Sequence, residues 1–173
     1  MPVSRTLVLT IIGDDRPGLV GELAAIISAR GGNWLDSSLA HLAGKFAGVV
    51  RIEVPDESTE AFLQALSTVP DLRVIAEVSS DPAAALGARR FALSLVGHDR
   101  IGIVSELSAV LARHSINVEK FTTRTASAPM SSETLFHADA ELQAGAGFDS
   151  ARLQEDLERI SADLMVDITL VDA

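Results

Sequence analysis

The chain contains no cysteine, and this absence excludes disulfide bonds, thiolate catalysis and zinc sites built on cysteine. A protein without disulfides fits best in a reducing compartment, so we expect it in the cytoplasm. The N-terminal segment also lacks the long apolar core and the small-residue cleavage site of a signal peptide. Its apolar run has the length of a strand and ends at Asp14 and Asp15, so we expect no targeting segment.

Basic residues are scarce, with 14 Lys and Arg against 24 Asp and Glu and a net charge of −10 at pH 7. Direct binding to nucleic acid requires clustered cations that neutralise phosphates, so the composition argues against it. Any role in gene control is therefore expected to act through a protein partner. Aromatic residues make up only 4%, but hydrophobic residues make up 47%, which indicates an ordinary folded globular protein.

The sequence contains an internal repeat. The segment GDDRPGLVGEL, from Gly13, recurs as GHDRIGIVSEL from Gly97, a shift of 84 positions. The apolar runs LVLTII and FALSLV precede the two copies in register, and Asn33 corresponds to Asn117 at the same shift. Such an extended register indicates a duplication. Two copies with so long a period do not make a solenoid, so each copy is expected to be a small domain.

Apolar periodicity assigns the same element order, βαββαβ, to each copy. In the first copy we expect strands at 7–12, 33–42, 46–54 and 73–78 and helices from 19 onward and at 59–68. In the second copy we expect strands at 91–96, 117–126, 134–142 and 165–171 and helices from 103 onward and at 150–162. This order predicts two α+β domains of ferredoxin-like fold, each an antiparallel sheet with both helices on one face. The predicted boundaries are 1–80 and 89–173, joined by a linker at 81–88.

The residues after the first strand of each copy resemble the signature of the ACT domain family. The segment 15–19, DRPGL, followed by Asn33, matches that signature in full. The segment 99–103, DRIGI, followed by Asn117, departs from it only at Ile101, which replaces a proline. The resemblance covers nearly the whole chain. It implies a non-enzymatic regulatory protein that senses an amino acid or a similar small ligand and regulates the transcription of amino-acid metabolism through a protein partner such as a transcriptional activator.

The same resemblance implies a ligand site at this turn, built across two paired domains in amino-acid-binding ACT proteins. The first amides of a helix carry partial positive charge and could bind a carboxylate, and a neighbouring aspartate could bind an α-ammonium group. Serine specificity is not expected, because Gly13 and Gly97 stand where serine-sensing relatives carry histidine. The expected ligand-binding residues are Asp15, Gly18, Leu19, Asn33, Asp99, Gly102, Ile103 and Asn117.

Each of these residues also has a purely structural interpretation. Asp15 and Asp99 could be caps of the following helices, because aspartate is favoured at that position. Asn33 and Asn117 could be turn residues in a left-handed conformation. Trp34 could pack against the sheet or lie as a lid over a ligand.

The sequence carries no catalytic motif and no metal-ligand spacing, so neither a cofactor nor a metal is expected. The chain ends at Ala173, directly after the last expected strand, so no catalytic domain is expected either. Two alternatives stay open: a regulatory module or subunit of an amino-acid or one-carbon enzyme, and a ligand-free dimerisation module. The expected partners are thus a small molecule and a protein, with a homodimer as an option, and neither nucleic acid nor a membrane.

Overall fold

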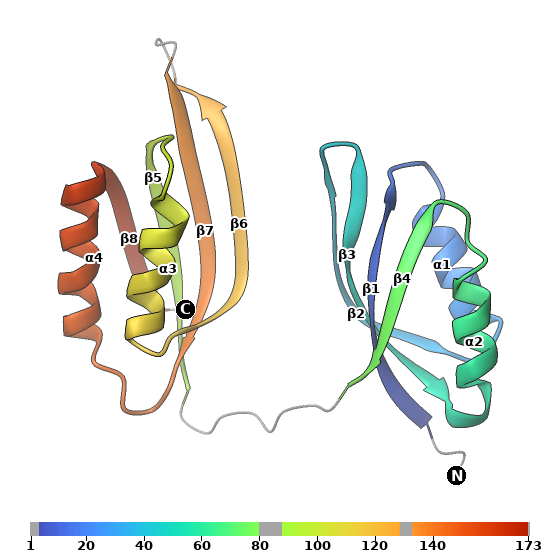
Figure 1. The fold of residues 1–173 in the computed structure, drawn as a ribbon. Coiled ribbons are helices and arrows are strands. Elements are labelled where there is room, and N and C mark those ends of the chain that lie inside the picture. The colour runs from blue at the N-terminus through green and yellow to red at the C-terminus, as the bar shows by residue number, and fades with distance from the viewer. Residues whose placement is uncertain (1–3, 80–87, 129–132, 173) are drawn as a thin grey trace. The chain divides into compact units, whose positions relative to one another are not determined.

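The computed structural model describes residues 4–79, 88–128 and 133–172. The chain divides into two compact units, Met1–Pro82 and Ala83–Ala173. In each unit two helices cover one face of a four-stranded antiparallel sheet (Figure 1). The predicted ferredoxin-like α+β fold is therefore confirmed in both copies. Seven of the eight residues of the predicted linker, 81–87, lie outside the described residues, and the exact domain boundaries stay a prediction.

The first module follows the expected order. Its sheet has the strand order β2-β3-β1-β4, so β1 lies inside the sheet and β2 and β4 form the edges. The elements are β1 (Ser4–Asp14), α1 (Leu19–Ser28), β2 (Asn33–Leu42), β3 (Lys45–Pro55), a short 3-10 helix η1 (Asp56–Ser58), α2 (Thr59–Leu66) and β4 (Leu72–Val78).

The second module repeats this topology, with the strand order β6-β7-β5-β8. Its elements are β5 (Arg89–His98), α3 (Ile103–Arg113), β6 (Asn117–Ser127), β7 (Thr134–Ala144), α4 (Ser150–Leu164) and β8 (Val166–Asp172). Even an irregularity is repeated: the register of β2 shifts at Leu35, and that of β6 shifts at Glu119, 84 positions later. The duplication is thus preserved in the backbone.

Alternating side chains of the central strands form the core of each module. Leu7, Leu9 and Ile11 of β1 are buried beneath the helices, where they pack with Phe62 of α2, which is fully buried. Because successive side chains of a strand point to opposite faces, the residues between them lie on the open face. Burial of one such large apolar side chain stabilises the fold by roughly 1.5–3 kcal/mol.

Tight turns place the ends of the strands. The hairpin between β2 and β3 has positive φ at Ala43 (50°) and Gly44 (79°). Two consecutive left-handed residues form a two-residue turn whose twist matches that of the two strands it connects. This turn joins the strands predicted at 33–42 and 46–54, and it lies beside the end of β1, where Asp14 pairs with Lys45.

Candidate functional site

The turn between β1 and α1 owes its conformation to a glycine. Gly18 is the N-cap residue of α1 and has φ of 94°, and Gly102 has φ of 102° before α3. Side chains rarely adopt this region, so glycine is required at both positions. No atom lies within 4 Å of the position that a Cβ of Gly18 would occupy. The backbone at Gly18 is therefore open to the approach of a small molecule.

The interpretation of Asp15 and Asp99 as helix caps is wrong. The N-cap residues are the two glycines, and neither α1 nor α3 has a side-chain hydrogen bond at its N-cap. Asp15 instead places Oδ2 2.8 Å from Nδ1 of His41. The first amides of α1 thus receive no side-chain cap, while the carboxylate of Asp15 lies three residues before the N-cap residue.

His41 is a residue of this region that the sequence did not single out. It lies near the end of β2, and its Nε2 accepts a hydrogen bond of 3.2 Å from the amide of Gly44. The amide of Asp15 donates to the carbonyl of Gly44 at 3.0 Å. A neutral imidazole with its proton on Nδ1 satisfies both contacts of the ring, because Nδ1–H then donates to Asp15. His41 therefore orients the Asp15 carboxylate toward the hairpin.

Arg16 fixes the other side of the turn. Its guanidinium makes two parallel hydrogen bonds to the carboxylate of Glu22 in the first turn of α1, at 2.6 and 2.7 Å. The hydrogen bond from Arg16 lowers the pKa of Glu22 below its ordinary value. Bidentate pairs of this kind restrict geometry as well as adding energy. The turn of the first module is therefore held on both sides.

The corresponding turn of the second module has fewer contacts. The amide of Asp99 donates to the carbonyl of Thr134 at 2.9 Å, in the manner of Asp15 and Gly44. His98 lies beside it, with Nδ1 3.6 Å from a carboxylate oxygen of Glu133. Within the described ranges, the carboxylate of Asp99 and the guanidinium of Arg100 form neither a hydrogen bond nor an ion pair. The two turns share their backbone but not their side-chain contacts.

Within one module, the asparagine does not approach the aspartate. Asn33 lies opposite Glu53, which pairs with Thr6 near the start of β1, whereas Asp15 follows the end of β1. The distance along the chain from Thr6 to Asp15 is roughly 30 Å at 3.3 Å per residue. The left-handed interpretation is also wrong, because Asn33 and Asn117 are the first residues of strands and have no positive φ. Asp15 and Asn33 of one module cannot contact the same small ligand.

Two other predicted residues contribute only their backbone. The side chains of Leu19 and Ile103 lie in the core, with 5% and 2% of their surface exposed. Their amides stand at the helix starts and are the part that a ligand could reach. Trp34 packs against the first core, which supports packing over a lid.

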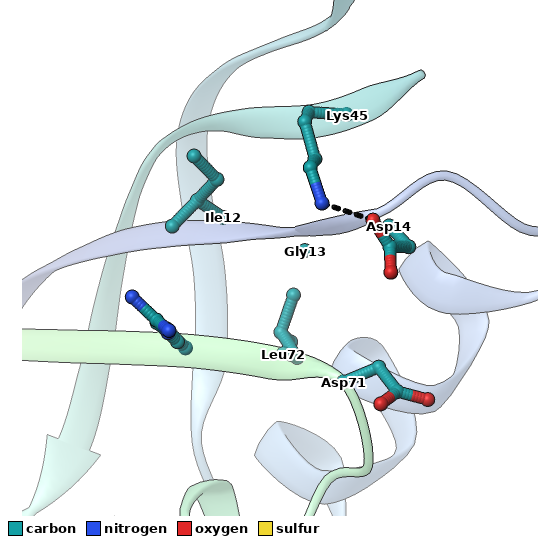
Figure 2. A pocket seen from close by; sticks show the side chains of 7 residues that line it. Ile12, Gly13, Asp14, Lys45, Asp71 and Leu72 are labelled. Atoms are coloured by element: carbon teal, nitrogen blue, oxygen red, sulfur yellow. Dashed lines mark hydrogen bonds and ion pairs between the residues drawn. The ribbon is translucent and has the colours of Figure 1, made fainter.

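A cavity of about 480 Å³ opens at the end of β1, next to the predicted turn (Figure 2). Its charged lining residues come from three strand ends: Asp14, Lys45, Asp71 and Arg73. Asp14 and Lys45 form an ion pair with each other. Among the described residues, the side chains of Asp71 and Arg73 form neither a hydrogen bond nor an ion pair. The charge of Asp71 helps to raise the pKa of Arg16, but the two groups do not form an ion pair. A carboxylate and a guanidinium that are outside any ion pair of the described residues therefore line the same cavity.

The apolar part of the cavity comes from two of these strands, β1 and β4. Ile12 and Leu72 line it together with Gly13, which is packed closely against the neighbouring strand end. A Cβ at Gly13 would lie 2.4 Å from the carbonyl oxygen of Asp71. A side chain at Gly13 is therefore incompatible with this arrangement. The Asp14–Asp15 doublet was the one sequence signal for this cavity, since Asp71 and Arg73 lie far away along the chain.

Some functions lack a basis in the described residues. No group of three or more His, Cys, Asp or Glu in those ranges is placed to bind a metal ion. No helix of the described segments is long and apolar enough to cross a membrane.

Two tandem ferredoxin-like modules, each with a glycine turn after its first strand, define the class to which this chain belongs. Residues 5–78, which make up most of the first module, match the family model of the ACT domain. The second module carries the same fold and the repeated turn. Among curated proteins, none matches the chain.

Two solved structures resemble the whole chain. A structure described as that of an "unknown protein" from Galdieria sulphuraria is 25% identical, with a TM-score of 0.89, and the match covers 99% of both chains. A protein named as a "putative glycine cleavage system transcriptional repressor" is 22% identical, with a TM-score of 0.70, and the match covers 99% of this chain and 98% of that one. The tandem arrangement therefore occurs in other proteins over its full length.

Proposed function

We propose that this chain is a non-enzymatic regulatory protein that binds a free amino acid at the end of β1 in its first module. The observation that carries this proposal is the cavity lined by both an unpaired carboxylate, Asp71, and an unpaired guanidinium, Arg73. A zwitterionic amino acid needs one group of each sign. The volume of about 480 Å³ lies in the range of small-molecule sites.

The predicted turn supplies a second pair of groups beside this cavity. The carboxylate of Asp15 could accept the ammonium group, and the uncapped amides after Gly18 could donate to the carboxylate of the ligand. Asp15 is already engaged by His41, at 2.8 Å, so a ligand there would replace that contact. The Asp71 and Arg73 side of the cavity requires no such exchange, and we place the charged groups of the ligand there first.

The experiment is a thermal-shift screen of the twenty amino acids, followed by calorimetry on the best ligand. Glycine is tested first, because one full-length structural relative is named for the glycine cleavage system. Saturation at 100 times Kd adds about 2.7 kcal/mol of apparent stability. We expect Asp71→Ala to weaken binding at least about tenfold, the loss of one charge-assisted hydrogen bond.

The variants Asp15→Ala and Asn33→Ala test whether the ligand binds at the predicted turn residues or in the cavity lined by Asp71 and Arg73. Loss of binding in Asp15→Ala alone would place the ligand at the turn and not in the cavity. Folding should weaken by less than about 1 kcal/mol in that variant, because the contact with His41 is exposed. Arg5→Ala, which removes an exposed arginine elsewhere in the same module, is the matched control and should bind normally. A ligand that binds all of these variants with unchanged affinity would refute the site.

We further propose that ligand binding alters the affinity of this chain for a protein partner that acts in transcription. The composition supports an indirect route, because a net charge of −10 repels DNA. We therefore expect no gel shift with the purified chain alone at physiological salt. A salt-sensitive gel shift by the chain alone would contradict this indirect route.

A further inference from the structure

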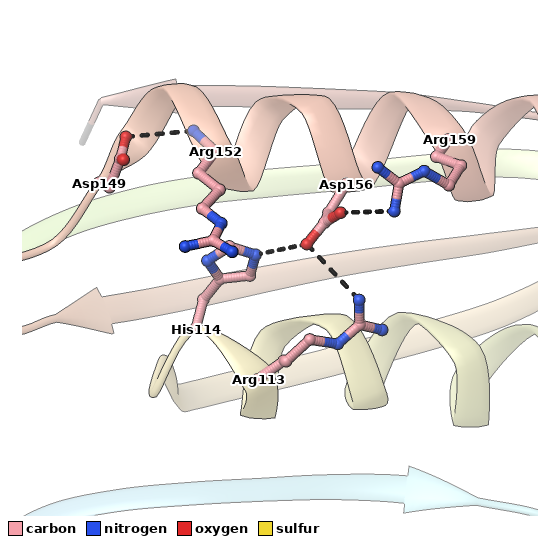
Figure 3. Close-up of polar contacts among 6 residues, drawn as sticks. All are labelled: Arg113, His114, Asp149, Arg152, Asp156 and Arg159. Carbon is pink, nitrogen blue, oxygen red and sulfur yellow. Dashed lines mark hydrogen bonds and ion pairs between the residues drawn. The ribbon is translucent and has the colours of Figure 1, made fainter.

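A second charged cavity lies on the helix layer of the second module. It measures about 500 Å³. It is lined by two consecutive residues at the end of α3 and by one face of α4 (Figure 3). The lining residues are Arg113, His114, Arg152, Glu155, Asp156 and Arg159.

Asp156 lies at the centre of this cluster and is only 14% exposed. Its Oδ2 lies 2.8 Å from Nε2 of His114, which is 10% exposed, and 3.6 Å from Arg113. Its Oδ1 accepts a hydrogen bond of 2.8 Å from Arg159. The hydrogen bond from His114 and the charges of Arg159 and Arg113 lower the pKa of Asp156. The carboxylate therefore stays ionised and holds three cationic or donor groups around one cavity.

The cluster has more positive than negative charge. Three guanidinium groups face two carboxylates, those of Asp156 and Glu155. Arg113 and Arg159 are 60% and 65% exposed, and each uses few of its five N–H donors on Asp156. The guanidinium of Arg152 has no hydrogen bond or ion pair within the described ranges. A chain with a net charge of −10 thus concentrates free donors and positive charge at one place.

The position of Arg152 has no structural explanation. It lies in the first turn of α4, where Asp149 caps the helix by accepting from the amide of Arg152. A cation in the first turn is disfavoured by the helix dipole, whereas Arg113 and His114, at the end of α3, are favoured by it. The fold accounts for Arg113 and His114 but not for Arg152.

Among its described residues, the first module has no counterpart of this cluster. Arg30, which corresponds to His114 at the 84-position shift, donates to the carbonyls of Ala61 and Ile26 at 3.2 and 3.5 Å. Helix α2, with the sequence TEAFLQAL, contains no arginine or lysine. The positive cavity is therefore a property of the second module alone and is not required by the shared fold.

We propose that this cavity binds a small molecule that carries a phosphate group. Arg152 and the free donors of Arg113 and Arg159 would contact the phosphoryl oxygens, because guanidinium groups match them with paired hydrogen bonds. Asp156 and His114 act as positioning residues that fix the two neighbouring arginines. A volume of about 500 Å³ suits a small ligand better than a protein segment.

The test is calorimetric titration of the intact chain with inorganic pyrophosphate at constant ionic strength. We expect saturable binding to the wild type and at least about tenfold weaker binding to Arg152→Ala. Because Arg152 is exposed, this variant should fold normally. Arg152→Lys keeps the charge but loses the paired donors, and it should fall between the two. Arg90→Ala removes an exposed arginine of the sheet in the same module and should bind like the wild type.

Three outcomes would overturn the proposal. One is the absence of heat at millimolar pyrophosphate, and another is equal affinity in the wild type and Arg152→Ala. The third is saturable binding of a polyglutamate peptide without binding of pyrophosphate, which would identify an acidic protein segment as the partner. Asp71 lies in the first module, so Asp71→Ala leaves the phosphate cavity intact. Pyrophosphate binding and amino-acid binding can therefore fail independently of each other.

Discussion

The two modules share their buried faces but differ on their exposed ones. On the open face of the first sheet, Thr10 lies between Val49 and Ile75, which are 45% and 63% exposed. At the corresponding place in the second sheet, Ser94 lies between Asp139 and Thr169. The duplication has therefore preserved the core, where any change creates a cavity or a clash, and has diverged where substitutions cost little.

The charged cavities follow the same pattern. In the first module the charged residues of the cavity lie at the end of β1. In the second module they lie at the end of α3 and along one face of α4. His98 of the second module occupies the position that Asp14 has in the first, so this acidic residue of the cavity lining is not repeated. The ligands proposed for the two modules therefore differ in chemistry.

The largest expected effect is the loss of stability when a side chain is added at Gly13 or Gly97, where each glycine packs closely against the neighbouring strand of its own module. A Cβ at Gly13 would lie 2.4 Å from a backbone oxygen, whereas a Cβ at Gly97 would first meet the side chain of Val166, at 2.3 Å. A change of rotamer at Val166 relieves the contact at 2.3 Å, which leaves contacts of 2.9 and 3.0 Å with its Cβ and Cα, whereas the carbonyl oxygen at Gly13 belongs to the backbone and has no such freedom. We expect Gly13→Ala to destabilise its module by about 1–3 kcal/mol and Gly97→Ala to cost less.

The measurement uses the single tryptophan of the chain, Trp34, whose fluorescence reports unfolding of the first module. Urea titrations of Gly13→Ala should shift the fluorescence midpoint, and those of Gly97→Ala should shift mainly the circular-dichroism signal. Gly21→Ala, at an open position of α1, is the control and should stabilise its module by about 0.5–1 kcal/mol. Equal losses in the Gly13 and Gly97 variants would contradict the difference in packing.

The next largest effect is the loss of stability when a carboxylate with a lowered pKa is neutralised, and it is compared between Asp156 and Glu22. A carboxylate whose pKa is lowered by folding stabilises the protein above its unfolded pKa, and this contribution is lost as the pH falls through the folded pKa. We expect Asp156→Asn to be destabilising at pH 7 and its deficit to shrink as the pH falls below about 4. Asp156 is 14% exposed and Glu22 is 44% exposed, so Glu22→Gln should cost less.

This comparison is checked by urea denaturation of both variants and the wild type between pH 7 and pH 3. Trp34 fluorescence isolates the Glu22 variant, and circular dichroism follows both. A deficit of Asp156→Asn that stays constant down to pH 3 would show that packing, and not the charge, is responsible.

The sequence predicted the fold well because its signals are local and doubled. Every predicted strand and helix is present, since alternation and helical spacing are properties of short segments. The end of β2 at Leu42 was located because Ala43 and Gly44 form a recognisable turn. A second copy in the same chain supplied an independent check of each element.

The candidate sites were less predictable, because they join residues that are distant along the chain. His41 meets Asp15 only because the β2–β3 hairpin returns to the end of β1. Asp156 and His114 belong to different helices, and no spacing links them. Asn33 was grouped with Asp15 by resemblance, yet within one module the sheet separates them. Spacing along the chain does not show which strand ends meet.

The smallest expected effect concerns the turn itself, where Pro17 of the first module corresponds to Ile101 of the second. The side chain of Ile101 is fully exposed, so its removal costs no burial. Its amide donates no hydrogen bond within the described residues, so a proline there would lose none. Proline fixes φ near −65° and reduces the freedom of the unfolded chain. We therefore expect Ile101→Pro to stabilise the second module by about 0.4–1 kcal/mol.

The reverse change, Pro17→Ile, should destabilise the first module by a similar amount, and it should lower the midpoint of Trp34 fluorescence in urea. The paired result would show that the two turns have the same backbone and differ only in stiffness. If Ile101→Pro instead destabilised the chain, φ at Ile101 would not suit proline. The missing proline of the second copy would then reflect a different turn, and the backbone match between Gly18 and Gly102 would not extend to the residue before each glycine.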